Sequence, residues 1–457
     1  MPASPRTAVD LEFARALGAG ALIPFRVAGY LWNKARIDDA VRADLASEPP
    51  ALGPVPHRAP LPASSPWTER PLRIFLSAAE HSGEIHAANL IDALSAAAAA
   101  RGLPAPEFHG LGGAALEARG MLSIGNPGAR AAMGFDGVLA ALPFYLRLLT
   151  ATTRHFQTWR PDLVLPVDSP ALHVPLGRLA KQCGALVAHF VTPQYWGWAP
   201  WRVRGYPSAV DLGLSILPFE PAWYARHGMQ TTHVGHPLLD ELAALGVETR
   251  KPSSGPPERV GPLMLLPGSR AGVVRRNLPW MLERVAELQA TPGFEDLEVR
   301  LPHSRTELDP LFEELFAASP AVVRRVHGPL HEELAKGSAA FIVSGTVVLD
   351  LLPHRLPAVV LYRLKSRLQG WMRRRLLSVP WFTSVNLLAN VEVHPEFAFH
   401  GDGPAVEVGA ALARALADAP WRAENLAGQE VAAERLGPPG AVKRAADAVL
   451  EWRLARP

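Results

Sequence analysis

Two short segments of the chain combine glycine, serine and charged side chains in a pattern that suits phosphate binding. Residues 265–270 read Leu-Leu-Pro-Gly-Ser-Arg, and residues 72–77 run into Ala-Glu-His-Ser-Gly-Glu at 79–84. Each apolar run is typical of a buried parallel strand that stops at a Gly/Ser turn before a helical pattern. Such a turn points backbone N–H groups outward at a helix N-terminus, where the helix dipole favours an anion. An ordinary strand-to-helix turn is the alternative, and the turns alone do not decide between the two.

Several polar side chains stand at the ends of apolar runs, where ligands bind in open parallel sheets. Arg270 adds a fork of donors beside the second turn, and a guanidinium pairs well with phosphate. The segment Ser344–Thr346 follows another apolar run and precedes a helical pattern, which predicts a further phosphate cradle. Asp168 closes the run 162–168, and its alternative role there is to cap the helix after Pro170.

The elements that must position these residues alternate between short apolar runs and helical patterns. A helix is expected over Glu84–Ala100 from its alanine and leucine content. Strands are expected at 72–77, 162–168, 185–191, 212–217, 263–266, 297–301, 339–343 and 358–361. Such alternation predicts parallel sheets covered by helices on both faces. The expected fold class is therefore α/β, with two Rossmann-like domains whose parallel sheets face each other across a cleft that holds a phosphorylated ligand.

Length and composition fit two domains with appendages. The chain has 457 residues, of which 48% are hydrophobic and 19% charged, and this is too long for a single core. The apolar stretch 16–25 is too short to span a bilayer and contains Pro24, so it predicts an interfacial or core-docking helix. We expect an N-terminal appendage at 1–48, a proline-rich linker at 49–70, Rossmann-like domains at 71–250 and 258–435, and a C-terminal helix at 436–457.

Charge and cysteine content limit the partners and the compartment. The formal net charge of +3 suits an anionic substrate or membrane surface and does not require nucleic acid. Cys183 is the only cysteine, which excludes a disulfide framework and a thiolate metal cluster and makes the cytosol the simplest compartment. Two amphipathic stretches suit a membrane surface: 138–149, which is otherwise a core-packing helix, and the arginine-rich 365–377, which is otherwise a solvated basic face.

Many short motifs, in order and at compatible spacing, resemble those of the bacterial lipid-A-disaccharide synthases. They extend from about residue 72 to about residue 397, so the chain is similar to a divergent member of that family with an N-terminal extension. The motifs are Glu80-His81-Ser82-Gly83-Glu84, Met133-Gly134, Pro161-Asp162, Val167-Asp168-Ser169-Pro170, His189-Phe190-Val191-Thr192-Pro193, Trp196-Gly197-Trp198, Leu217-Pro218-Phe219-Glu220, Val234-Gly235-His236-Pro237, Leu266-Pro267-Gly268-Ser269-Arg270, Ser344-Gly345-Thr346 and Asn386-Leu387-Leu388-Ala389.

The resemblance implies an inverting glycosyltransferase of GT-B architecture that acts in lipid A biosynthesis. The donor would be UDP-linked 2,3-diacylglucosamine and the acceptor 2,3-diacylglucosamine 1-phosphate, giving a β-1,6-linked disaccharide 1-phosphate and UDP. No cofactor or metal is implied, and the sequence contains no Asp-x-Asp metal motif. His327 and His331 have the spacing of a zinc pair, but Gly328-Pro329 would break a helix between them, so they are interpreted as turn residues.

The resemblance also assigns roles to individual residues. Asp168 matches the base that takes the acceptor hydroxyl proton, which inversion in one step requires. Glu80 and Ser82 join it as catalytic residues, although first-turn capping is the alternative role of the glutamates. Ser269 and Arg270 would meet the UDP phosphates. The other implied substrate-binding residues are Gly83, Glu84, Ser344, Gly345, Thr346, Asp350 at the ribose hydroxyls, and Asn386, which is otherwise a turn residue.

Some positions depart from the family pattern and keep other functions open. Ala171 and His173 replace a second Asp and an Asn, Val273 replaces a Glu, Gly137 replaces a Glu with Asp136 beside it, and Phe399 lies where a Gln is expected. The alternatives are another GT-B UDP-sugar transferase or epimerase acting on soluble sugars, and a non-catalytic membrane-associated paralogue. The expected partners are the UDP-linked diacylated glucosamine, its monosaccharide 1-phosphate acceptor and an anionic membrane surface, without nucleic acid. Peripheral binding to the cytoplasmic face of the inner membrane is expected, and a homodimer is left open.

Overall fold

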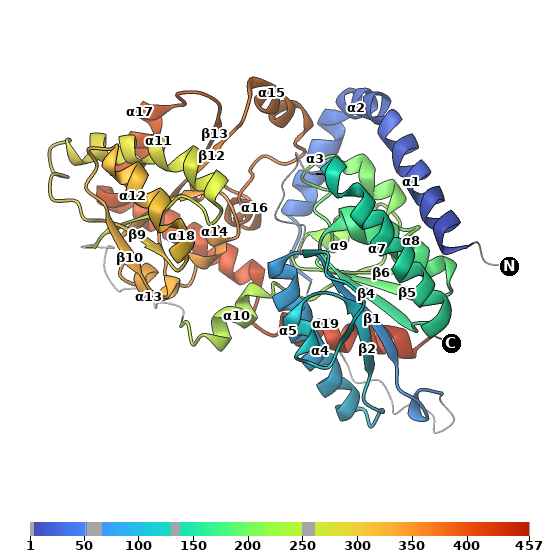
Figure 1. Cartoon of the computed structure of the whole chain (residues 1–457). Helices are drawn as coiled ribbons and strands as arrows, with labels where there is room; N and C mark the ends of the chain where they lie inside the picture. Colours follow the sequence, from blue (N-terminus) through green and yellow to red (C-terminus); the bar gives the residue numbers. More distant parts are fainter. Residues whose placement is uncertain (1–3, 51, 53–65, 129–137, 249–260, 457) are drawn as a thin grey trace. The chain divides into compact units, whose positions relative to one another are not determined.

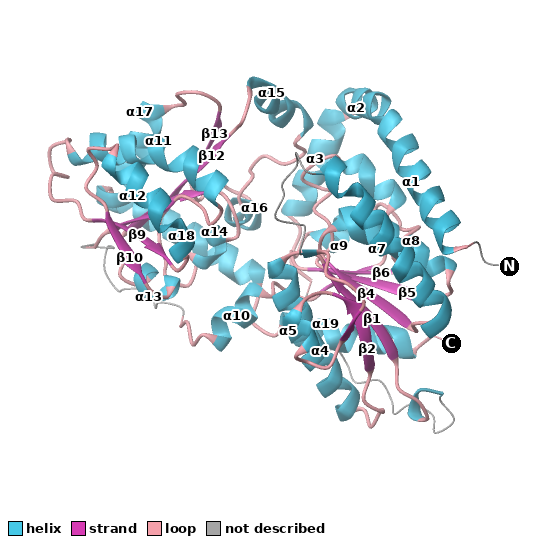
Figure 2. Ribbon diagram, in the orientation of Figure 1, coloured by secondary structure: helices cyan, strands magenta, loops and turns pink. Residues whose placement is uncertain are grey.

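The computed structural model describes residues 4–50, 52, 66–128, 138–248 and 261–456 (Figures 1 and 2). The chain divides into two compact units: unit 1 is Met1–Glu241 with Gly437–Pro457, and unit 2 is Leu242–Leu436. Each unit is built on its own parallel sheet, which confirms the expected α/β fold class. The Met133-Gly134 motif and the departure at Gly137 lie outside the described residues.

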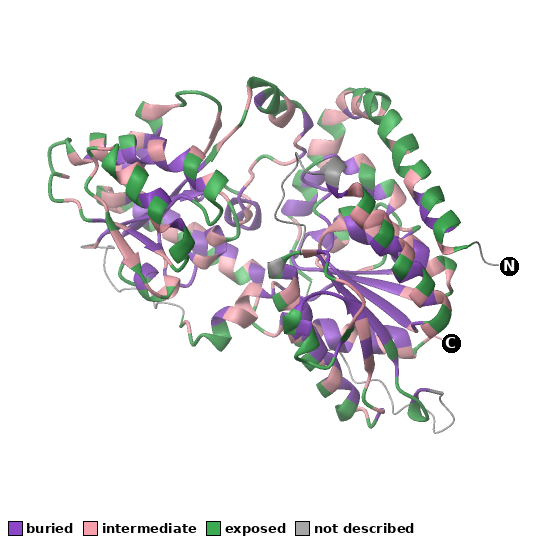
Figure 3. Ribbon diagram, viewed as in Figure 1, coloured by how far each residue is buried: buried purple, intermediate pink, exposed green. Residues whose placement is uncertain are grey.

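The sheet of unit 1 has seven strands in the order β3-β2-β1-β4-β5-β6-β7. These are β1 (Arg73–Ala78), β2 (Glu107–Leu111), β3 (Leu122–Ser123), β4 (Leu163–Val167), β5 (Leu186–Phe190), β6 (Leu212–Ser215) and β7 (Thr231–His233). Ala78 at the end of β1 lies opposite Val167 at the end of β4. Every residue of β4 is buried, as Figure 3 shows for the central strands, because helices cover both faces of the sheet.

Helices connect these strands and close the unit. They are α4 (His81–Ala100), α5 (Ala114–Glu117), α7 (Val138–Trp159), α8 (Pro170–Gln182), α9 (Glu220–Ala225) and α19 (Ala441–Leu454), with the 3₁₀ turns η1 (Pro66–Thr68) and η3 (Pro200–Gly205). Helix α10 (Leu238–Ala244) begins in unit 1 and ends in unit 2. The C-terminal helix α19 packs on α4, where Arg101 pairs with Asp447 at 2.9 Å. No helix within the described residues is long and apolar enough to cross a membrane.

The chain begins with three helices, α1 (Pro5–Ala21), α2 (Ile23–Trp32) and α3 (Lys34–Leu45). Helix α1 packs against α7 and α8, and α3 packs against α9. Leu22 separates α1 from α2, and Pro24 is tolerated in the first turn of α2 because no N–H is needed there. Buried Glu12 accepts from Arg178 Nη1 at 3.1 Å, and buried Asp44 forms a two-pronged ion pair with Arg226. The apolar stretch 16–25 thus belongs to a helical segment that is docked by ion pairs.

The sheet of unit 2 has six strands in the order β10-β9-β8-β11-β12-β13. These are β8 (Leu263–Leu266), β9 (Val299–His303), β10 (Arg324–His327), β11 (Ala339–Val343), β12 (Ala358–Arg363) and β13 (Glu396–Phe399). The helices are α11 (Ala271–Gln289), α12 (Asp309–Ala317), α13 (Leu330–Leu334), α14 (Val347–Asp350), α15 (Arg367–Leu376), α16 (Ser384–Ala389), α17 (Ala405–Ala417) and α18 (Ala419–Leu436), with η4 (Thr306–Leu308). One core joins α11 and α12 to the sheet through buried Trp280, Phe312 and Phe341.

The expected strands all occur, and those at 263–266 and 339–343 match the structure to the residue. The structure adds the interior strand β2 and the edge strands β3, β7, β10 and β13, which the sequence does not predict. β10 and β13 are exposed or half-buried along their whole length, so they lack the continuous apolar run that marks a central strand.

Candidate functional site

Each sheet has a switch point, where the connections from two adjacent parallel strands run in opposite directions. It lies between β1 and β4 in unit 1, and between β8 and β11 in unit 2. Open α/β sheets bind ligands beyond the carboxyl ends of their strands at such points. Glu80 and Asp168 follow β1 and β4, and Ser269 and Ser344 follow β8 and β11. These four predicted site residues therefore follow the strands that flank the switch point of each unit.

The backbone at Asp168 is strained and held in place. Asp168 and Ser169 have φ angles of 53° and 45°, in the left-handed region, which costs on the order of 1–3 kcal/mol per residue. The Asp168 carbonyl oxygen accepts from His173 Nδ1 at 2.6 Å and from His189 Nε2 at 2.8 Å. The Asp168 N–H donates to the Phe190 carbonyl at 2.9 Å. These bonds fix the turn from which the Asp168 carboxylate projects.

The two histidines that hold this turn are fully buried. His173 Nε2 lies 2.9 Å from Ser77 Oγ, and His189 Nδ1 lies 2.9 Å from the Tyr206 hydroxyl oxygen. Each neutral ring can donate to the Asp168 carbonyl and accept from a hydroxyl, so a single proton per ring satisfies both nitrogens. Burial lowers the pKa of His173 to about 4 and that of His189 to about 3, which keeps both rings neutral near pH 7.

The sequence does not predict this histidine pair. His189 is visible only as part of a family motif, and His173 only as a departure from the family Asn. A lone histidine in an apolar stretch is ordinarily a satisfied core residue, and nothing in its neighbours marks the partner carbonyl. The two donors come from different elements, α8 and β5, so only the fold brings them to one atom.

The Asp168 carboxyl is in an environment that suits a base. Burial raises its pKa, and the nearby Glu80 raises it further, while the Ser169 backbone N–H and His86 act in the opposite direction. His86 Nδ1 in turn lies 3.2 Å from Glu241 Oε1. A carboxylate whose pKa is raised holds a proton more tightly than an exposed one, so this position can accept a proton during a reaction.

The predicted residues at the start of α4 have different surroundings. Ser82 is exposed and Gly83 is buried, and a Cβ built on Gly83 would stand 3.8 Å from the Val167 carbonyl oxygen. The protein itself therefore leaves room for alanine at Gly83. Glu84 Oε1 accepts from the Ala115 N–H at 3.3 Å, which ties α4 to α5. Glu84 is thus engaged within unit 1, and this contact supports a structural role.

In unit 2, the turn after β8 leaves its polar residues exposed. Gly268 has a φ of 104°, and a Cβ there would meet Val273 Cγ1 at 2.6 Å, so the turn requires glycine. Val273, which stands where the family has Glu, packs under this turn. Ser269 and Arg270 are exposed, and Arg270 begins α11 without capping it through its side chain. Since the first N–H groups of a helix lack partners within it, the start of α11 offers donors to an anion.

The turn after β11 has a similar exposed form. The Ser344 N–H donates to the Leu361 carbonyl at 2.9 Å, and Gly345 and Thr346 are exposed at the start of α14. Asp350, at the end of α14, has its Oδ1 3.7 Å from His331 Nε2. The ring of His331 also lies against His354, with Nδ1 and Nε2 3.0 Å apart. His331 is in α13 and His327 ends β10, so the interpretation of both as turn residues is wrong, and the two do not form a helical zinc pair either.

The Asn386 side chain holds neighbouring backbone segments of unit 2 together through hydrogen bonds. It is completely buried, and its Nδ2 donates to the His394 carbonyl at 2.8 Å and to Glu396 Oε2 at 3.1 Å. Its Oδ1 accepts from the N–H groups of Val393 at 3.0 Å and His394 at 2.9 Å. Burial raises the pKa of Glu396 to about 7. The carboxamide is fully used, which supports the turn alternative.

Within the described residues, one cluster of histidine and carboxylate groups is compact enough to share a cation. His303, Asp309 and His327 place their nitrogen and oxygen atoms within 4.8 Å of one another. Arg325 Nη1 already lies 3.6 Å from Asp309 Oδ1, so a guanidinium provides positive charge there. The cluster is at β9 and β10, away from the switch point of unit 2. We interpret it as a set of ion pairs around Asp309.

Comparison with solved structures defines the class of fold. A putative UDP-N-acetylglucosamine 2-epimerase from Listeria monocytogenes matches with a TM-score of 0.52 and 14% identity, over 83% of this chain and 95% of that one. The calicheamicin glycosyltransferase CalG4 matches with a TM-score of 0.51 and 15% identity, over 85% of this chain and 99% of that one. At such low identity the likeness concerns the fold alone, which is the GT-B architecture.

Sequence comparison then identifies the family. The model of the lipid-A-disaccharide synthetase family matches residues 74–430. The lipid-A-disaccharide synthase of Myxococcus xanthus is 34% identical over 383 residues, covering 83% of this chain and 97% of that protein. The synthase of Syntrophus aciditrophicus is 33% identical over 380 residues, covering 82% and 96%. The chain therefore belongs to the lipid-A-disaccharide synthase family, and helices α1–α3 precede the matched residues.

Proposed function

We propose that the chain transfers 2,3-diacylglucosamine from its UDP conjugate to 2,3-diacylglucosamine 1-phosphate, with inversion at the anomeric carbon. Family membership supports a glycosyltransferase of lipid A disaccharide synthesis. One structural observation supports the mechanism: the left-handed turn at Asp168, held at its carbonyl by two neutral buried histidines. A base that must act at a fixed point needs a backbone of this kind.

In this mechanism Asp168 is the general base of unit 1. As the acceptor hydroxyl oxygen bonds to the anomeric carbon, the bond from that carbon to the UDP oxygen breaks, and the hydroxyl proton passes to Asp168. The raised pKa of Asp168 suits this transfer. Glu80 is the neighbouring carboxylate, and Ser82 and Gly83 contact sugar or phosphate groups of the substrate.

The residues of unit 2 stabilise the leaving group. Ser269, Arg270 and the exposed start of α11 bind the diphosphate of UDP, because charge that develops on the departing oxygen is neutralised by fixed donors. Ser344, Gly345 and Thr346 provide a second phosphate cradle. Asp350 binds the ribose while sharing its carboxylate with His331. Asn386 is a positioning residue that acts through Glu396.

Acylated substrates reside in a membrane, and we propose that the protein binds peripherally at the cytoplasmic face of the inner membrane. In α15, Leu368 and Trp371 are 64% and 44% exposed, beside exposed Arg374 and Arg375. Arg373 differs from its neighbours, because its Cζ lies 4.9 Å from the ring centroid of Phe382.

Helix α7 contributes less to a membrane surface than its sequence suggests. In its described first turns Leu148 and Leu149 are buried, and Leu142, Phe144 and Leu146 are partly buried. The core-packing alternative therefore accounts for this part of the helix, and we assign the membrane contact to other elements.

The test is an assay with the purified full chain. UDP-diacylglucosamine and the monosaccharide 1-phosphate are supplied in detergent micelles, and products are read by mass spectrometry. We expect a disaccharide 1-phosphate and one UDP released per disaccharide. Epimerisation of UDP-N-acetylglucosamine, or transfer only to soluble sugars, would replace the proposal with the soluble-sugar alternative. Absence of turnover with intact UDP binding would favour the non-catalytic paralogue.

A further inference from the structure

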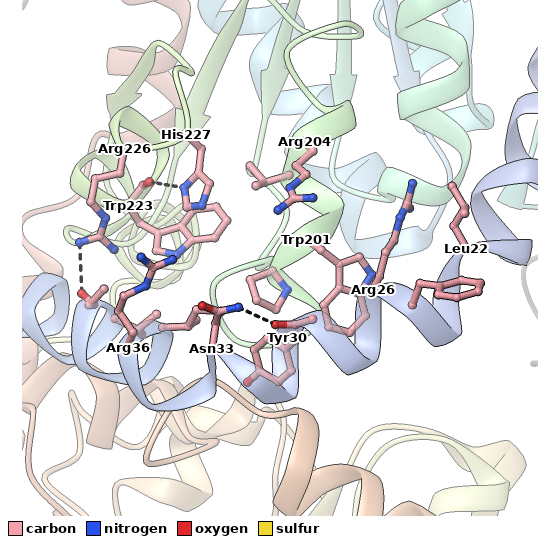
Figure 4. Close-up of a pocket in the computed structure, with 17 residues that line it drawn as sticks. Leu22, Arg26, Tyr30, Asn33, Arg36, Trp201, Arg204, Trp223, Arg226 and His227 are labelled. Atoms are coloured by element: carbon pink, nitrogen blue, oxygen red, sulfur yellow. Dashed lines mark hydrogen bonds between the residues drawn. The ribbon is translucent and has the colours of Figure 1, made fainter.

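A hollow of about 760 Å³ lies in unit 1 between the N-terminal helices and the body of the unit (Figure 4). One wall is formed by α2 and α3, and the other by η3 and α9. The first wall belongs to the segment that precedes the family match at residue 74, and the second lies within that match. The hollow is therefore a feature that the N-terminal extension adds to the fold of the family.

Fixed contacts hold the two walls together. Tyr30 of α2 is buried with its ring centroid 5.4 Å from that of Trp201 in η3. At the other end, both carboxylate oxygens of Asp44 in α3 accept hydrogen bonds from the Arg226 guanidinium. Arg226 Nη1 also donates to the Ala40 carbonyl at 3.1 Å. A hollow held by contacts at both ends is preorganised, so ligand binding does not have to supply free energy to open it.

The lining carries positive charge without a carboxylate among its residues. Arg26, Arg36, Arg204 and Arg226 line the hollow, and only Arg226 is paired with an acidic side chain. The side chains of Arg26, Arg36 and Arg204 make no hydrogen bond or ion pair with any described residue. Figure 4 shows Arg36 and Arg204 extending into the space from opposite walls. Such a set of guanidinium groups favours an anion, and phosphate matches their geometry best.

The rest of the lining is apolar and continues onto an exposed rim. Trp223 is buried at 1% exposure and forms part of the wall. Leu22 and Phe25 also line the hollow, yet they are 49% and 76% exposed, and Ile23 beside them is 49% exposed. A free phosphate or a nucleotide would leave this apolar rim unexplained. Arginines beside exposed Leu and Phe are instead what an interfacial helix presents to anionic lipid.

We propose that this hollow binds the phosphate head group of an anionic phospholipid, while Leu22, Ile23 and Phe25 of the α2 rim enter the acyl layer. The inference rests on the proposed function only in that acylated substrates bring the enzyme to a membrane. Arg26, Arg36 and Arg204 bind the phosphate, and α2 lies along the bilayer surface. The extension thereby supplies a membrane anchor that the rest of the family fold does not need for its chemistry.

The test compares two triple variants of the full chain by flotation with vesicles. Vesicles contain phosphatidylcholine alone or with one part in three of phosphatidylglycerol. Arg26→Gln/Arg36→Gln/Arg204→Gln removes the proposed ligands, and Arg6→Gln/Arg42→Gln/Arg154→Gln removes the same charge from exposed positions outside the hollow. We expect the first variant to lose about tenfold or more of its binding to the phosphatidylglycerol vesicles, given the contribution of each near-surface arginine. The control variant should lose clearly less.

A second arm tests the apolar rim and the source of the phosphate. Leu22→Ser/Phe25→Ser should also weaken vesicle binding, whereas Val406→Ser, at an exposed apolar position in unit 2, should not. Equal losses in both triple variants would overturn the proposal, because net charge would then suffice. It would also be overturned if calorimetry showed tight binding of inorganic phosphate that the first triple variant loses while its vesicle binding is unchanged.

The outcome is separable from that of the proposed function. In detergent micelles, the Arg26→Gln/Arg36→Gln/Arg204→Gln variant should keep the disaccharide synthesis of the wild type, because none of these residues belongs to a switch point. If the wild type makes no disaccharide, the proposed function fails, and flotation still decides the lipid site. If turnover is normal but flotation does not distinguish the triple variants, the lipid site alone fails.

Discussion

The switch points of the two units hold their candidate functional residues in opposite ways. In unit 1, Asp168 sits on a left-handed turn that is fixed by buried His173 and His189, and burial raises the pKa of its carboxyl. In unit 2, Ser269 and Arg270 are exposed at the start of a helix. The carboxyl at the unit 1 switch point is therefore largely shielded from water and its backbone is strained, whereas the polar residues at the unit 2 switch point are exposed to water.

This difference follows from the chemistry that each point would perform. A base gains strength when water is removed from its carboxylate, and its position relative to the attacked carbon tolerates little error. A diphosphate is large and strongly charged, so backbone N–H groups and a flexible guanidinium can bind it from an exposed surface. Substitution of the base at the unit 1 switch point should therefore abolish most turnover, whereas substitutions at the unit 2 switch point should weaken diphosphate binding by degrees.

The largest expected effect is that of Asp168→Asn. The amide keeps the size of the side chain but cannot take up the proton, so turnover should fall by ~10²–10⁴-fold while UDP affinity and thermal stability stay near wild type. The exposed Asp92→Asn in α4 serves as the control and should keep full turnover. In the wild type, kcat/KM should decline as the pH falls through the raised pKa of Asp168. Normal turnover in Asp168→Asn would remove this residue from the mechanism.

At the unit 2 switch point, Arg270→Ala should weaken UDP binding in a graded way. Hydrogen bonds to charged groups contribute about 1.5–3 kcal/mol, so calorimetry should show roughly tenfold or more loss of affinity. Arg275→Ala is a matched control on the same helix, since Arg275 is paired with Glu314 at 3.1 Å. If both variants bind UDP like the wild type, the turn after β8 is an ordinary strand-to-helix connection.

The role of the histidine hydrogen bonds to the Asp168 carbonyl can be tested with the variant His173→Leu. This change removes one donor to the Asp168 carbonyl and leaves the buried Ser77 hydroxyl unpaired, at a cost of about 1–3 kcal/mol in the free energy of unfolding. Turnover should fall while the KM for the UDP-sugar stays unchanged, and His173→Asn should restore part of it. His155→Leu, at a half-buried His109–His155 contact away from the switch point, should lower stability without this loss of kcat. The same loss of kcat in both variants would refute a positioning role.

How far the sequence predicts this arrangement depends on how local each signal is. The strands at 263–266 and 339–343 are uninterrupted apolar runs bounded by Pro, Gly or Ser, so their ends can be read directly. For the same reason, the sequence predicts that Asp168, Ser269 and Ser344 follow strand ends, as they do in the structure. The interactions of His173, Asn386 and Glu396 depend on residues that the chain brings together from separate elements, and no local pattern marks them. Whether a polar residue faces a ligand or a neighbouring loop is decided by tertiary contacts.

Acidification should lower the stability of unit 1 more than that of unit 2. Burial lowers the pKa of four histidines in unit 1 and one in unit 2 to about 4 or below: His173, His189, His233 and His236, and His394. An unfolded histidine titrates near 6.5, so the unfolded state binds more protons and stability is lost as pH falls below that value. Carboxyls with raised pKa act in the opposite sense and are Asp44, Asp168 and Glu220 in unit 1 and Glu396 in unit 2.

Hydrogen exchange at pH 7 and pH 5, read by mass spectrometry, measures this difference. Peptides from β4 and β5 should lose more protection on acidification than peptides from β8 and β11. Equal losses would show that the buried histidines of unit 1 do not control its stability. The double variant His173→Asn/His189→Gln should reduce the acid sensitivity of β4, because neither replacement can take up a proton.

The smallest expected effect concerns α15, the exposed basic helix of unit 2. Near an anionic surface each arginine contributes about 1 kcal/mol, and salt screens that attraction. Arg374→Glu/Arg375→Glu should therefore reduce flotation with phosphatidylglycerol vesicles and lessen its salt dependence, while Arg373, stacked on Phe382, is left in place. Arg305→Glu/Arg324→Glu makes the same charge change on another part of unit 2 and should have little effect. If α15 and this control behave alike, unit 2 does not contact the membrane through α15.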